Sequence, residues 1–150
     1  MNGPPDRFWL ETDRRPEGVT DATVDAVGRL SEALEWVERD RGRLYDFHQM
    51  CGHADLLLGD AADRLAEAGA TSLAEELRTT LIGRNVIEGR WSFQIVEEYD
   101  ETYWGPLRTF AQRVRDDLVD GRHHVHESEM KERRRTAGLA HHEQRPEAGR

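Results

Sequence analysis

Apolar residues recur every three or four positions from Thr20 onward, which is the spacing of one face of an α-helix. The pattern predicts a helix over 20–51, with Thr20 as its N-cap and acidic residues in its first turn. We expect Gly52 to end or bend this helix, and a shorter second helix to run to Gly69. The apolar positions of the two helices are Val24, Val27, Leu30, Leu34, Val37, Leu44, Phe47, Cys51, Leu57, Ala61, Leu65 and Ala68.

A third helix is indicated after the turn at Gly69. Ser72 and Glu75 have the spacing of a capping box, in which each side chain accepts a hydrogen bond from the backbone N–H of the other residue. The helix should stop before Gly83. Its apolar face is formed by leucines, Leu73, Leu77 and Leu81.

The segment 91–104 fits two kinds of structure. Its first residues alternate between apolar and polar, as in a strand, whereas Trp91, Ile95, Tyr99 and Tyr103 lie four apart, as in a helix. We favour the helix, because no second convincing strand exists to pair with the first and a lone strand leaves backbone groups unpaired.

Pro106 suits the first position of a last helix, expected over 106–135. Residues 1–19 hold three prolines and no sustained period, which predicts an extended arm whose Phe8, Trp9 and Leu10 are free to dock on the body. Residues 136–150 are polar, with Gly and Pro, and we expect a disordered tail. The last helix has its apolar residues at Leu107, Phe110, Val114, Leu118, Val125 and Met130.

These elements predict an all-α fold: a single-domain helical bundle of four to five helices over 20–135. Two long antiparallel helices, 20–51 and 106–135, would each extend about 45 Å and be bridged by the shorter ones.

Charge and cysteine content narrow the partners. Of 150 residues, 30 are acidic and 21 basic, for a net charge of −9, which disfavours nucleic acid and anionic membrane surfaces. No apolar run approaches the 20 or so residues of a membrane span, and no secretory signal is readable, so we expect a soluble protein. Cys51 is the only cysteine, which fits a reducing cytoplasm. Lys131 is the only lysine, a bias that either codon usage or adaptation to salt would produce.

The richest chemistry lies in the same segment 91–104, where aromatic rings stand beside carboxylates. Rings and carboxylates together suit a cation, and on a helix Glu97 and Glu101 would share a face near Trp104 able to hold an amine or guanidinium. The alternative is that the rings form a core stripe and the acids its solvated side. The candidate binding residues of this segment are Trp91, Phe93, Glu97, Tyr99, Glu101 and Trp104.

Two histidine clusters offer metal-ligand types. His48 and His53 stand near Cys51, Asp46 and Asp55, although five residues of continuous helix would point the two rings in different directions. We keep His48 and His53 as candidate binding residues, the alternative being a helix-terminal His48 and a buried Cys51. The other cluster is His123, His124, His126, Glu127 and Glu129.

The sequence was compared with the site patterns of three families of helical metalloenzymes. A ferritin-like site needs Glu three residues before His, which does not occur here. A hemerythrin-like site needs histidines spaced along the bundle, whereas the histidines here lie near helix ends and in the tail. Glu35-Trp-Val-Glu38 and Glu97-Glu-Tyr-Asp100 are similar to the magnesium motifs of MazG-type nucleotide pyrophosphohydrolases. Their separation is far longer than in that family, so we do not assign the chain to it.

The sequence favours a small acidic binding or protein-interaction module with an acidic aromatic surface, over an enzyme. We expect no cofactor and no metal, and a protein or small cationic ligand as partner, with a homodimer left open. The alternative is a Mg- or Mn-dependent hydrolase of nucleotide phosphoanhydrides, using Glu35, Glu38, Glu97 and Asp100.

Overall fold

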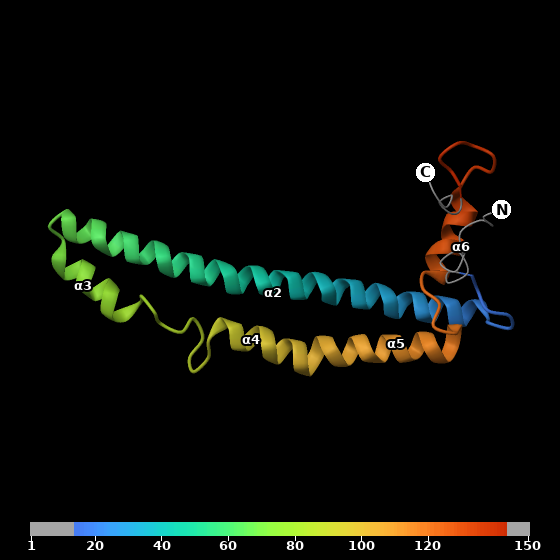
Figure 1. Ribbon diagram of the computed structural model, residues 1–150, viewed down its shortest axis with the longest axis horizontal. Coiled ribbons are helices and arrows are strands. Elements are labelled where there is room, and N and C mark those ends of the chain that lie inside the picture. The colour runs from blue at the N-terminus through green and yellow to red at the C-terminus, as the bar shows by residue number, and fades with distance from the viewer. Residues whose placement is uncertain (1–13, 144–150) are drawn as a thin grey trace, which may run out of the picture. The chain divides into compact units, whose positions relative to one another are not determined.

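A computed structural model describes residues 14–143 of the chain. This part is 73% helical, in four continuous helical segments without a strand, which confirms the predicted all-α fold. The elements are α2 (Asp21–Glu67), α3 (Thr71–Thr80), α4 (Ser92–Tyr99), the π-helix η1 (Asp100–Trp104), α5 (Gly105–Val119) and α6 (Val125–Arg134) (Figure 1). Most of the predicted arm, with Phe8, Trp9 and Leu10, and the end of the predicted tail lie outside the described residues.

The described residues group into two compact units that share helix α2. Unit 1 joins the chain up to Trp36 with the chain from Leu107 onward, and unit 2 is Val37–Pro106. The single domain over 20–135 stays a prediction.

Helix α2 is one helix of 47 residues, about 70 Å long at 1.5 Å per residue. The prediction that Gly52 ends or bends it was wrong. A Cβ at Gly52 would meet nothing within 4 Å, so no close approach of another chain segment requires glycine there. The half-buried Leu58 and buried Ala62 continue the inward face beyond it, and their packing outweighs the roughly 1 kcal/mol that glycine costs in a helix.

Both ends of α2 form as the sequence predicts. The N–H of Thr23 donates to Oγ1 of Thr20 at 3.2 Å, which makes Thr20 the N-cap. At the other end Gly69 has a φ of +86°, and the N–H of Ala70 reaches back to the carbonyl oxygen of Leu65 at 2.9 Å.

The capping box predicted at Ser72 and Glu75 does not form. Helix α3 begins at Thr71, and no side chain caps it. The reason is that the carbonyl oxygen of Ala70 already accepts the N–H of Ala74 at 3.0 Å, which places Ser72 inside the first turn. The helix ends before Gly83, as predicted.

Residues 92–104 are helical, which confirms the choice of helix over strand for this segment, but Pro106 does not begin a new helix. Helices α4, η1 and α5 are continuous. The N–H of Gly105 donates to the carbonyl oxygen of Asp100, five residues back, so the π-helical turn lies just before a proline that has no N–H to offer. A Cβ at Gly105 would lie 2.8 Å from that oxygen, so this turn needs glycine.

The single long helix predicted over 106–135 was also wrong, because α5 ends at Val119 and α6 begins at Val125. The N–H of Gly121 donates to the carbonyl oxygen of Arg115 at 2.9 Å, which closes α5. Gly121 is left-handed, with a φ of 70°. Beyond it the chain turns into α6 (Figure 1).

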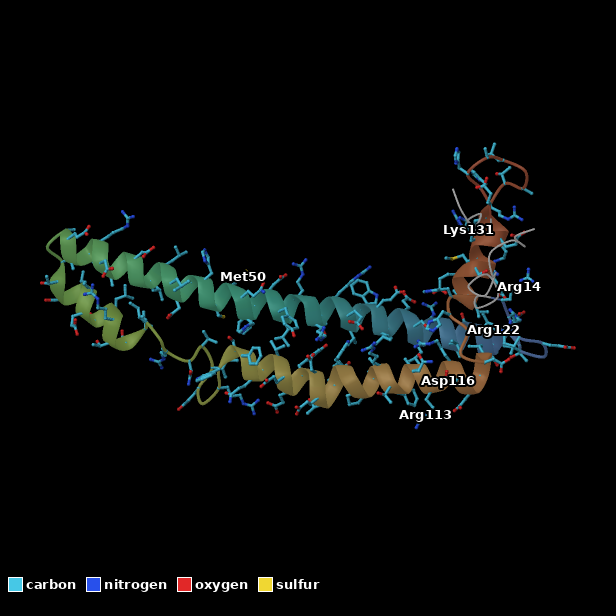
Figure 2. All side chains as sticks on the ribbon, in the orientation of Figure 1. Arg14, Met50, Arg113, Asp116, Arg122 and Lys131 are labelled. Atoms are coloured by element: carbon cyan, nitrogen blue, oxygen red, sulfur yellow. The ribbon has the colours of Figure 1, made fainter. Side chains whose placement is uncertain are left out.

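Unit 1 is held by buried side chains and by contacts across long sequence separations. The guanidinium of Arg15 donates to both carboxylate oxygens of Glu129, at 2.7 and 2.8 Å, and to Asp21 at 2.6 Å. Arg122 donates to the carbonyl oxygen of Arg14 at 2.8 Å (both labelled in Figure 2). The buried apolar residues of the unit are Val24, Val27, Ala111, Val119 and Val125.

In unit 2, helix α4 lies antiparallel to its part of α2. Arg41 pairs with Asp100, whereas His48, further along α2, contacts Ser92, earlier in the chain. The buried apolar residues of the unit are small, Val37, Ala62, Ala74 and Val96. Within 14–143, no helix is long and apolar enough to cross a membrane.

Candidate interaction surface

Segment 91–104, the acidic aromatic segment, does bind a guanidinium, and this group is the side chain of Arg41 from the same chain. The guanidinium carbon of Arg41 lies 4.0 Å from the ring centre of Trp104, a cation–π contact. Arg41 also donates to both carboxylate oxygens of Asp100, at 2.7 and 3.0 Å, and these bonds hold the pKa of Asp100 below its ordinary value. The partner carboxylate is therefore Asp100, while Glu97 and Glu101 remain exposed.

Tyr99, another predicted binding residue, is half-buried in unit 2. Its hydroxyl donates to Asp40 at 3.4 Å, and its ring meets the edge of the Tyr103 ring with centres 5.5 Å apart. Burial, followed by the charge of Asp40, raises the pKa of Tyr99. These contacts fit the packing alternative for this ring better than a ligand site.

Trp91 and Phe93 lie at the start of α4 and are exposed. Trp91 is 69% exposed. Phe93 is about half exposed and packs against His48, with ring centres 5.4 Å apart. His48 is half-buried, and its Nδ1 lies 2.9 Å from the hydroxyl oxygen of Ser92. Trp91 and Phe93, together with Tyr103, are the exposed aromatic side chains of segment 91–104.

The histidines and carboxylates proposed from sequence do not gather into a metal site. Because α2 continues through Gly52, His48 and His53 stay five residues apart on one helix, and His53 is exposed. In the C-terminal cluster, Glu129 is bound by Arg15. Within residues 14–143, no group of three or more His, Cys, Asp or Glu is placed to hold a metal ion, so Glu35, Glu38, Glu97 and Asp100 form no such group.

A groove of about 530 Å³ opens in unit 2 between α2 and the connection from α3 to α4. Residues of α2 line one side of it, and the exposed side chains of Leu81, Val86 and Trp91 line the other. The connection is fixed to α2 by Asp55, whose carboxylate accepts the N–H of Gly83 at 2.7 Å. The α2 residues of the groove are Cys51, Gly52, Ala54, Asp55 and Leu58.

Beside the groove, α2 carries a second apolar row, here called the α2 stripe: Phe47, Met50, Ala54, Leu57 and Ala61. Its spacing of three and four residues puts all five on one face of the helix. The first four are exposed, with Met50 at 62%, and Ala54 belongs to both stripe and groove. Figure 2 labels Met50 on the side of α2 away from α4.

The sequence reasoning missed the α2 stripe, although a signal for it was present. The 3–4–3–4 spacing was readable, but Phe47 was assigned to a single inward row with Leu44 and Cys51. The structure shows two apolar rows on α2: one row faces α3 and α4, and the other faces outward.

Large apolar side chains are exposed throughout unit 2. Eleven of them are more than a third exposed in this unit, against five in the described part of unit 1. They are Phe47, Met50, Leu56, Leu57, Leu73, Leu81, Val86, Ile87, Trp91, Phe93 and Tyr103. Scattered exposed leucines are ordinary, whereas here exposed apolar side chains gather along a groove and a helix face, which makes this surface the candidate for an interaction.

Comparison with known proteins found no relative from which a function of this surface could be inferred. No protein-family model matches the chain, and no curated protein or solved structure matches it either.

Proposed function

We propose that this protein is a binding module that acts through protein–protein contact, with the groove and α2 stripe of unit 2 as its interface. The observation that carries the proposal is Trp91, 69% exposed at the edge of a groove of about 530 Å³. Tryptophan is enriched among the residues that dominate binding energy at interfaces, and exposing it is unfavourable without a partner.

A protein partner fits these contacts better than a small cation. The cation position beside Trp104 is filled by Arg41, whose two bonds to Asp100 complete it. A largely apolar surface remains open from the groove onto the α2 stripe, a form suited to the side chains of another helix.

The test is affinity capture with three immobilised proteins: the wild type, the double variant Trp91→Ser/Val86→Ser, and the matched control Leu118→Ser. Leu118 is also about half exposed but belongs to unit 1. We expect the same polypeptide to be retained by the wild type and the control, and lost by the double variant. Equal retention by all three proteins would show that the groove is not the interface.

A further inference from the structure

We propose that the α2 stripe pairs two copies of this chain as an antiparallel homodimer, with the two-fold axis beside Ala54. This inference rests on the proposed function and names the partner at one part of its surface. The spacing of the stripe is that of positions a and d in a coiled coil, which pack against a second helix.

The order of side chains in the stripe selects a second copy in antiparallel orientation. A two-fold interface requires a patch that is complementary to itself. With the axis beside Ala54, Phe47 of one copy faces Ala61 of the other, and Met50 faces Leu57. Phe47 then meets the methyl group of Ala61 at both ends of the stripe, and the small pair of Ala54 residues lies at the axis. A parallel pair would set Phe47 against Phe47 and Ala61 against Ala61, so side-chain volume would differ more from one layer to the next.

The exposed area agrees with a dimer that uses both stripe and groove. The stripe alone offers roughly 300 Å² of large apolar side chain per copy, well below the approximately 800 Å² that each partner gives to a standard interface. Leu81, Val86, Trp91 and Phe93 raise the total to roughly 700 Å². Because Ala54 borders the groove, the axis brings the grooves of both copies to the same side of the paired helices.

Charge distinguishes this partner from a cationic one. The outward edge of the stripe carries Asp46, Asp60 and Arg64, so the antiparallel pair brings Asp46 of one copy near both an acid and a base of the other, and these local charges largely cancel. Each copy has a net charge of −9, so two copies repel one another overall. Added salt should therefore strengthen this dimer, whereas salt weakens the binding of a cationic partner.

Light scattering on the full chain tests the pairing. We expect the wild type to have twice the monomer mass of 17.3 kDa at tens of micromolar protein, and to dissociate less in higher salt. Leu57→Glu should weaken the dimer at least about 100-fold, because it buries an unpaired carboxylate in each copy. Leu56→Glu is the matched control: Leu56 is 71% exposed and lies off the stripe, so this variant should stay dimeric. A monomeric wild type, or a dimer that Leu57→Glu leaves intact, overturns the proposal.

Engineered cysteines test the orientation without relying on a disruptive variant. In a Cys51→Ser background, mixing Met50→Cys with Leu57→Cys protein should give mostly the mixed disulfide under mild oxidation. An excess of the two like-with-like disulfides would show a parallel pair and would overturn the proposed axis. Circular dichroism of each variant confirms that helix content is unchanged.

The outcomes separate this inference from the proposed function. If the chain is monomeric, but the wild type retains a polypeptide that Trp91→Ser/Val86→Ser does not, a second copy is excluded as the partner and the proposed binding module stands. If the chain is dimeric through the α2 stripe and capture does not depend on the groove, the homodimer stands and the wider interface fails.

Discussion

The two units of this protein use apolar residues in opposite ways. The described part of unit 1 buries five apolar residues and exposes five large ones, whereas unit 2 buries four and exposes eleven. Unit 1 also joins distant parts of the chain by the Arg15–Glu129 pair, 114 residues apart. The comparison teaches that the same helix, α2, serves mainly packing in its first half and leaves a row of apolar side chains exposed in its second.

The largest expected effect is the loss of stability when a charge is placed in the core of unit 1 instead of on its surface. Val119 is fully buried, so Val119→Asp places an unpaired carboxylate in the core and should lower the free energy of unfolding by at least about 3 kcal/mol. The neighbouring Leu118 is about half exposed, and Leu118→Asp should cost less than about 1 kcal/mol. Urea denaturation followed by circular dichroism measures both. Similar costs for the two variants would mean that unit 1 lacks the core assigned to it.

Two glycines of unit 2 should respond in opposite directions to alanine. Gly105→Ala brings a methyl group to 2.8 Å from the carbonyl oxygen of Asp100 and should destabilise the protein by about 1–3 kcal/mol through strain. Gly52→Ala meets nothing within 4 Å in the middle of α2, so it should stabilise the protein by about 1 kcal/mol. The same denaturation experiment reads both. A stabilising Gly105→Ala would contradict the close approach in the π-helical turn.

The fold class followed from the sequence because apolar spacing and end signals are local. Thr20 and Gly69 mark the two ends of α2, and both positions form as predicted. Helix continuity was misjudged wherever a tertiary contact or a five-residue hydrogen bond outweighed a local breaker. Gly52 and Pro106 lie within continuous helix for this reason, while the break after Val119 depends on left-handed residues that the apolar spacing does not reveal.

The chemistry of the candidate site was readable in kind, but its partners were not. Rings beside carboxylates indicated a cation, and Arg41 provides one. Arg41 and Asp100 are 59 residues apart in the sequence, so no local sequence pattern relates them. The exposed row on α2 could have been found from its spacing. Which of two apolar rows is covered, however, depends on where α3 and α4 pack.

The smallest expected effect is a difference in how the two units respond to acid. Partial burial and the nearby charge of Arg115 lower the pKa of His123, in unit 1, below its ordinary 6.5. The folded form therefore disfavours protonated His123, so its stabilisation is present above pH 6.5 and is lost as the pH falls through the lowered value. Asp100, in unit 2, has a pKa lowered from 3.8 by Arg41, so its contribution is present above pH 3.8 and is lost only in stronger acid.

Amide hydrogen exchange, corrected for the intrinsic effect of pH, resolves the two units separately. On acidification from pH 7, protection in α6 should begin to fall once the pH is below 6.5, while protection in α4 persists until below pH 3.8. His123→Gln should remove the first step and leave the second, and Asp100→Asn should do the reverse, because each variant deletes one titrating group. Loss of protection in α4 before α6, or a first step that survives in His123→Gln, would show that these two groups do not set the acid response of their units.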